Sequence, residues 1–156
     1  MLLPHLGGSP SVWNTCMMFF QGILLAGYLY AHLCTRYIPS KWQLTVHLTL
    51  LAVGLLFLPF KIDHHWLGLD QSPISNLTHL LFITAAPPLF AISASAPLLQ
   101  RWFSTTDHPT ANDPYYLYAA SNAGSLLALI AFPFLLEPWM SLSFQTWSWS
   151  LGFAAL

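Results

Sequence analysis

Charge is the scarcest feature of this 156-residue chain. Lys and Arg number 4 and Asp and Glu number 5, so charged residues make up 6% of the sequence. Water-soluble domains carry about a quarter of their residues as charge, because their surfaces must be hydrated. So little charge cannot cover a soluble surface, and four basic residues exclude nucleic acid as a partner. We therefore expect the outer surface to face lipid or other apolar protein.

The motifs of common soluble chemistry are also missing. The sequence has no glycine-rich dinucleotide or phosphate loop and no His-Glu-x-x-His metal motif. Its two cysteines, Cys16 and Cys34, form no Cys-x-x-Cys pair. On one helix they would lie about 27 Å apart, well beyond the roughly 7 Å that a disulfide allows. No catalytic residue is identified, and the chain is not expected to be an enzyme.

Long apolar runs are what the sequence does contain, with 56% hydrophobic residues. A helix needs about 20 apolar residues to cross a bilayer core of roughly 30 Å. Runs long enough occur at about 12–35, 42–60, 74–103 and 115–136, and a shorter fifth run covers 140–156. These runs are apolar on all sides, which is typical of helices and not of membrane barrel strands. The prediction is a single all-α integral membrane domain over 1–156, a polytopic transmembrane helix bundle of four full spans plus a partial fifth.

The third run differs from the others in its length and its prolines. As one straight helix, 74–103 would measure about 45 Å, longer than the hydrocarbon core. It contains Pro87, Pro88 and Pro97, each of which removes a backbone hydrogen bond. We therefore predict that this helix is kinked or broken. The plainer interpretation is a packing adjustment, and the alternative is the solute site that such breaks form in transporters.

Polar residues inside the apolar runs indicate surfaces that face protein, because polar side chains in lipid are costly. The first run carries a stripe of Asn14, Gln21, Tyr28 and His32. The fourth run carries Tyr118, Asn122 and Ser125 beside Gly124, which belongs to a small-xxx-small series. Small residues let a second helix approach closely. We expect the two stripes to pack against each other or against a partner subunit.

Histidines raise two cofactor hypotheses. His32 and His47 would lie at similar depth on neighbouring antiparallel helices, the arrangement that two axial ligands of haem b require. Four further histidines, with Asp63 and Asp70, are candidates for a metal site on the opposite face, since imidazole and carboxylate suit first-row ions. These histidines are His5, His64, His65 and His79. Packing is the plainer interpretation of both sets, so no cofactor is predicted.

Basic residues near the helix ends predict the orientation. Arg36, Lys41 and Arg101 fall on one side of the membrane, which is expected to be cytoplasmic. On the other side Lys61 lies among acidic residues, namely Asp63, Asp70 and Glu137. The expected location is a bacterial inner membrane, crossed several times.

Three stretches resemble a known family. They are LPHLGGSPSVWNTC at 3–16, APLLQRWF at 96–103 and DPYYLYAASNAGS at 113–125. Together they are similar to the membrane region of bacterial spermidine-synthase-like proteins, in which transporter-like helices are fused to an aminopropyltransferase-like domain. In that family the catalytic domain would follow residue 156, so the resemblance implies no catalytic residue within this chain.

These observations favour a non-catalytic membrane subunit or anchoring module that packs in a larger assembly with other membrane proteins. Two alternatives stay open. One is a transporter-like half-bundle with a solute site at the broken third helix, and the other is the membrane part of a spermidine-synthase-like enzyme.

Overall fold

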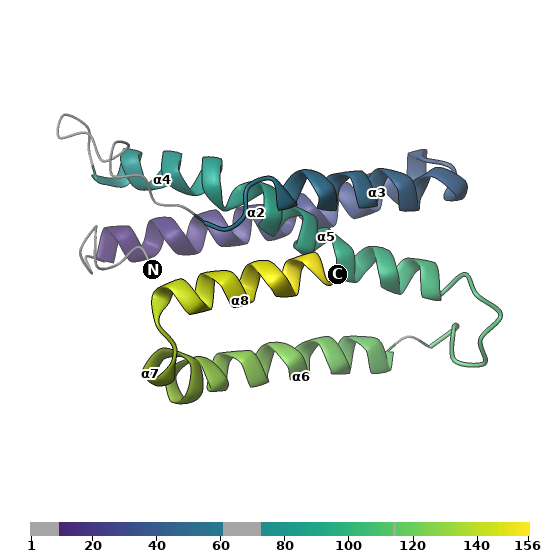
Figure 1. Cartoon of the computed structure of the whole chain (residues 1–156). Helices are drawn as coiled ribbons and strands as arrows, with labels where there is room; N and C mark the ends of the chain where they lie inside the picture. Colours follow the sequence, from purple (N-terminus) through teal and green to yellow (C-terminus); the bar gives the residue numbers. More distant parts are fainter. Residues whose placement is uncertain (1–9, 61–72, 114) are drawn as a thin grey trace.

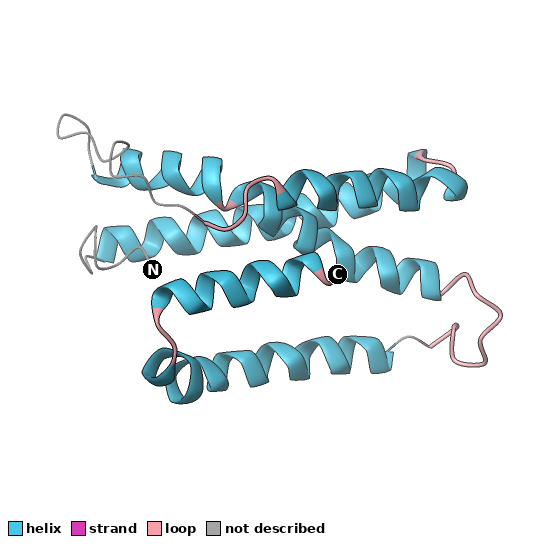
Figure 2. Ribbon diagram, viewed as in Figure 1, coloured by secondary structure: helices cyan, strands magenta, loops and turns pink. Residues whose placement is uncertain are grey.

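The computed structural model describes residues 10–60, 73–113 and 115–156, and every regular element in these ranges is helical. Figure 1 shows the helices running roughly along one common direction, and Figure 2 shows the short loops between them. The elements are α2 (Pro10–Tyr37), α3 (Ser40–Leu55), α4 (Pro73–Thr84), α5 (Ala86–Phe103), α6 (Tyr115–Ala131), the π-helical turn η2 (Phe132–Leu136), α7 (Glu137–Trp139) and α8 (Leu142–Ala154). The all-α prediction is confirmed for these ranges.

Two helices are long and apolar enough to cross a membrane. They are α2, with 28 residues, and the 25-residue segment Tyr115–Trp139 that joins α6, η2 and α7. The bent pair α4 and α5 qualifies as a third span if it is counted as one. The structure therefore supports a membrane protein with two to three candidate spans, and the predicted four full spans plus a partial fifth are not confirmed.

The second predicted span is shorter than expected. α3 ends at Leu55 after 16 residues, where the sequence predicted a helix to residue 60. Its length is about 24 Å at 1.5 Å per residue, below the roughly 30 Å of a bilayer core. Pro59 explains the early end, because it has no N–H to donate to the Leu55 carbonyl four residues earlier and its ring clashes with that carbonyl. α8 is shorter still, with 13 residues.

The predicted break of the third helix is confirmed. α4 and α5 are bent by 60° at Ala85, just before Pro87 and Pro88. Neither proline can donate the hydrogen bond that would continue the helix, so the break falls at this pair. Pro97, by contrast, lies inside α5 without ending it.

The core lies where α2 packs against α4 and α5. One cluster joins α2 to α4 through Val12, Phe19, Leu77 and Leu81. A second joins α2 to α5 through Ala31, Cys34 and Leu98. Helix α3 also packs against α5, and α8 contacts α3.

Helix α6 stands apart from this core. No residue of Tyr115–Trp139 is buried, and Figure 1 shows α6 along one edge of the molecule. Large apolar side chains such as Leu127 and Phe134 are exposed along it. Elsewhere α2 exposes Trp13 and Leu25 in the same way. An apolar exterior of this kind is what a lipid environment requires.

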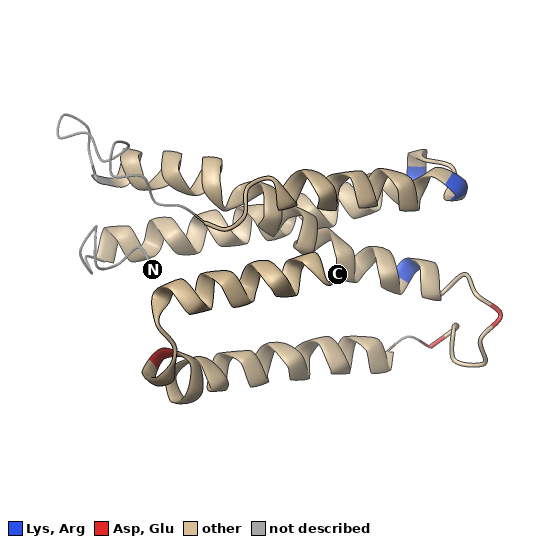
Figure 3. Cartoon of the chain, in the orientation of Figure 1, with Lys and Arg blue, Asp and Glu red and all other residues tan. Residues whose placement is uncertain are grey.

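Charged residues lie near the ends of the helices. Arg36, Lys41 and Arg101 all lie at one end of the molecule, and Glu137 lies at the opposite end (Figure 3). Asp107 and Asp113 lie in the loop at the first end. Over the described residues, the middle turns of the helices carry no charged side chain, as a hydrocarbon environment demands.

Candidate functional site

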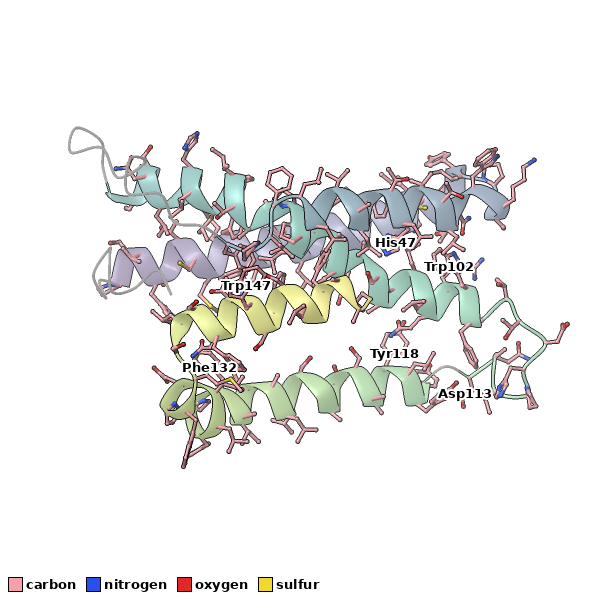
Figure 4. All side chains as sticks on the ribbon, viewed as in Figure 1. His47, Trp102, Asp113, Tyr118, Phe132 and Trp147 are labelled. Carbon is pink, nitrogen blue, oxygen red and sulfur yellow. The ribbon has the colours of Figure 1, made fainter. Side chains whose placement is uncertain are left out.

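A cluster of polar and aromatic side chains occupies the contact between α2, α3 and α5. Its centre is His47 on α3, which is only 4% exposed. Gln43 lies one turn earlier on α3 and is equally buried. Residues four apart share one face of a helix, so both side chains point from α3 toward α5. Figure 4 shows His47 and Trp102 in this region.

His47 links α3 to α5 by a hydrogen bond. Its Nε2 lies 3.0 Å from the Ser95 Oγ. The Ser95 hydroxyl donates its only hydrogen to the Ala91 carbonyl at 3.0 Å, so it must accept from His47. This geometry places a proton on Nε2, and in the neutral imidazole Nδ1 is then a hydrogen-bond acceptor.

Aromatic rings enclose the imidazole on two sides. The Tyr30 ring of α2 stacks on it at a centroid distance of 6.2 Å and an interplanar angle of 29°. The Trp102 ring of α5 meets it edge-on at 6.2 Å. Trp102 also donates from Nε1 to the Gln43 Oε1 at 2.8 Å. Gln43 in turn donates to the Ile38 carbonyl at 2.8 Å, so its amide is bonded at both ends.

Two polar atoms of the cluster are buried without a hydrogen-bond partner among the described residues. They are the His47 Nδ1 and the Tyr30 hydroxyl. A buried group of this kind costs free energy unless water or a ligand satisfies it. The cluster can therefore accept or donate a hydrogen bond in the core. Its paired groups join α3 to α5, and α2 contributes the Tyr30 ring.

The hydrogen bond between His47 and Ser95 should couple the two residues energetically. We expect His47→Leu and Ser95→Ala to show a coupling energy of about 0.6 kcal/mol, and at most about 1.7, in a double-mutant cycle. The measurement is unfolding of the full chain in detergent micelles. Strictly additive effects would contradict the bond. The control is the double-mutant cycle of His47→Leu with Ser104→Ala, because the Ser104 hydroxyl donates to the Arg101 carbonyl at the end of its own helix. This cycle should show additive effects.

The two predicted haem ligands, His32 and His47, do not face each other. His47 is buried, whereas His32 is exposed. Tyr30 is the α2 residue whose ring lies beside His47. A shift of two residues turns a helix by about 200°, so His32 points away from that contact. The structure therefore does not bring the two imidazoles together within this chain.

Of the four histidines predicted for a metal site, only His79 is described, and it is exposed on α4. His5, His64 and His65 lie outside the described residues, as do Asp63 and Asp70. Within 10–60, 73–113 and 115–156, no three His, Cys, Asp or Glu side chains gather closely enough to hold a metal ion. The metal hypothesis stays a prediction.

The two predicted polar stripes do not face each other. Asn14, Gln21, Tyr28 and His32 are exposed on α2, and Tyr118, Asn122, Gly124 and Ser125 are exposed on α6. In Figure 4 the labelled Tyr118 lies on α6, away from the contact between α2 and α5. The expectation that the two stripes pack against each other within the chain is therefore not met. Their packing against a partner subunit stays a prediction.

Sequence reasoning missed most of the cluster around His47. Gln43, Tyr30 and Trp102 were not singled out, although Gln43 and His47 are spaced as neighbours on one helix face. That spacing of two polar residues in an apolar run is the signal that points to an interior contact.

A pocket lies beside the break between α4 and α5. Its volume is about 260 Å³, and its lining residues are Leu56, Phe57, Leu58, Pro59, Ile83 and Thr84. The lining thus comes from the end of α3 and the end of α4. This is the location that the sequence suggested for a solute site.

Comparisons with known proteins do not place the chain in a family. The resemblance to spermidine-synthase-like membrane regions accordingly stays a prediction from the three sequence stretches that carry it. The geometry described above is the remaining guide to function. No protein-family model, no curated protein and no solved structure matches the chain.

Proposed function

We propose that this chain is a non-catalytic membrane subunit, or anchoring module, that packs in a larger membrane assembly. The observation that carries the proposal is the exposure of hydrogen-bonding side chains within apolar helices. Asn14 and Gln21 on α2 and Asn122 on α6 are all exposed in the isolated chain. In lipid each of these amides would lack hydrogen-bond partners, which is costly.

The partner that fits these surfaces is another transmembrane helix with polar side chains of its own. On α6, Ala120, Gly124 and Ala128 follow one another at four-residue intervals, and nothing lies within 4 Å of a Cβ added at Gly124. Small residues at this spacing let a helix approach closely, and Ser125 lies at the edge of the face that they form. Asn122 is two residues from Gly124, about 200° around the helix, so it offers its amide to a partner on another side of α6.

Replacing the α2 amides tests this role. We expect Asn14→Leu with Gln21→Leu to leave the fold of the chain intact, since both side chains are exposed, and to weaken association with partner subunits. Each interhelical hydrogen bond lost should cost about 0.6 kcal/mol. The measurement is native mass spectrometry of the assembly extracted in mild detergent.

Met18→Leu is the matched control, because Met18 is 67% exposed on the same helix and carries no hydrogen-bonding group. It should leave the assembly unchanged. A chain that is a stable lone monomer in mild detergent, with or without the substitutions, would contradict the subunit role.

The transporter-like half-bundle is the second candidate, and the pocket at the broken third helix favours it. Discontinuous helices form substrate and ion sites in transporters near the middle of the bilayer. A lone monomer that binds a small solute would support this candidate. The membrane part of a spermidine-synthase-like enzyme is a third, and it rests on the sequence resemblance alone.

We also propose that the membrane is the bacterial inner membrane, with Arg36, Lys41 and Arg101 on the cytoplasmic side. The support is that these three basic residues lie at one end of the helices (Figure 3). Cytoplasmic loops carry an excess of Lys and Arg. Asp107 and Asp113 at the same end do not weaken the assignment, because acidic residues contribute little to orientation.

A further inference from the structure

The pocket between the ends of α3 and α4 has an unusual lining. Of its six lining residues, only Thr84 has a polar side chain. Every other polar group that the lining can present is therefore a backbone group. The backbone here is not regular helix, since α3 has ended at Leu55 and α4 ends at Thr84.

Two carbonyl groups of the lining lose their helical hydrogen bond to proline. In an α-helix the carbonyls of Ile83 and Thr84 would accept from the N–H groups of residues 87 and 88. Both of those residues are proline and have no N–H. The consequence is two main-chain oxygens beside the pocket without their regular donors.

The end of α3 adds a third such oxygen. After Leu55 the chain tightens into bonds to the third residue back, from Leu56 to Val53, from Phe57 to Gly54 and from Leu58 to Leu55. The next bond in that series would run from residue 59 to the Leu56 carbonyl. Residue 59 is Pro59, which has no donor. Leu56 therefore contributes an oxygen of the same kind.

These oxygens lie at the negative ends of two helices. The carbonyl end of a helix carries a partial charge of about −0.5, and here α3 and α4 both end at the pocket, against the single positive end of α5 at Ala86. Non-helical backbone at membrane depth is tolerated only where it is buried in protein or lines a water-filled cavity. A volume of about 260 Å³ leaves room for an ion with several waters, each of which takes roughly 30 Å³.

From this arrangement we propose that the pocket binds a monovalent alkali cation, sodium or potassium, through the carbonyl oxygens of Leu56, Ile83 and Thr84 and the Thr84 hydroxyl. Neutral carbonyl oxygens take the place of the hydration shell of such ions in channel filters and transporters. A divalent ion is disfavoured because the lining contains no carboxylate, the usual ligand of Ca²⁺ and Mg²⁺. This inference is independent of the proposed subunit role.

The experiment measures thermal unfolding of the full chain in detergent micelles. Sodium chloride and potassium chloride are each titrated against N-methyl-D-glucamine chloride at constant ionic strength. A ligand that binds only the folded state stabilises it, so the apparent Tm should rise with one alkali ion and then level off. At ten times the Kd, the apparent unfolding constant should fall about elevenfold. An identical Tm in all three salts would overturn the proposal and indicate a pocket filled with water alone.

Pro88→Ala is the sharpest variant, because it supplies the N–H that the Thr84 carbonyl lacks. It should reduce the alkali-dependent rise in Tm, and Pro87→Ala combined with it should reduce the rise further. Pro97→Ala is the matched control, since Pro97 lies inside α5 and is not among the pocket-lining residues. It should keep the full rise in Tm.

A second variant addresses the case in which the proline changes disturb the fold. Thr84→Val keeps the shape of the side chain and replaces the hydroxyl with a methyl group, and it should weaken the alkali dependence without abolishing it. An unchanged midpoint of the alkali titration in both Thr84→Val and Pro88→Ala would place the ion elsewhere and overturn the assignment to this pocket.

Discussion

Replacing Leu98 with alanine should lower the free energy of unfolding by about 2–5 kcal/mol. Leu98 is fully buried where α5 packs on α2, against Ala31 and Cys34. Truncation removes apolar contacts and leaves a cavity that these small neighbours cannot close. Unfolding of the full chain in micelles, followed by circular dichroism, measures the effect.

Leu99→Ala provides the control at the next position. Leu99 is 57% exposed on the same helix, so lipid or detergent can fill the space that the substitution leaves. Its effect should stay within about 0.5 kcal/mol. Equal losses at the two positions would mean that α5 presents a different face to α2.

Among substitutions that add one methyl group to α2, Gly27→Ala should lower the stability of the fold the most. A Cβ at this position would lie 2.9 Å from the Ser93 Cβ and 3.1 Å from the Ala94 backbone nitrogen. Because the second of these atoms is main chain, α2 and α5 would have to move apart. We expect a loss of about 1–3 kcal/mol, the usual cost of overpacking, measured by the same unfolding experiment.

Gly22→Ala separates this steric effect from helix propensity. Nothing lies within 4 Å of a Cβ added at Gly22, which is on the same helix. Both substitutions gain the propensity advantage of alanine over glycine, about 1 kcal/mol. The difference between the two variants therefore reports the contact with α5 alone, and no difference would show that the helices are not in contact at Gly27.

The helical segments were predictable because they depend on local chemistry. Apolar runs predicted where α2 ends and where α6 begins: the runs at about 12–35 and 115–136 correspond to Pro10–Tyr37 and to the helix that starts at Tyr115. The Asp113 carboxylate accepts from the Tyr115 N–H at 3.4 Å, as expected of a residue that caps a helix. The end of α3 was predicted too late, because the apolar run continues to residue 60 whereas Pro59 already interrupts the helix four residues earlier, at Leu55.

The candidate site was less predictable. His47 was singled out as one ligand of a haem pair, yet its structural neighbours are Tyr30, Ser95 and Trp102. These residues are 17, 48 and 55 positions away in the sequence. Local periodicity carries no information on such separations, since it describes one helix at a time.

The sequence by itself determined the kind of solvent, the helical class and the presence of a break in the third helix. Those properties follow from composition and from the missing N–H of proline, which act whatever the helix packs against. Only the tertiary structure decided which face of α2 turns inward. The buried face includes Gly27 and Ala31, whereas the stripe of Asn14, Gln21 and Tyr28 is exposed.

The physical reason lies in what drives helix packing in an apolar environment. Apolar side chains gain little by leaving lipid for another helix, so the distribution of apolar residues does not select the contact face. Close approach selects it, through small residues such as Gly27 on α2 and Ala94 on α5. Whether two small residues meet depends on how the 60° bend between α4 and α5 directs the second helix, and that geometry exists only in the folded chain.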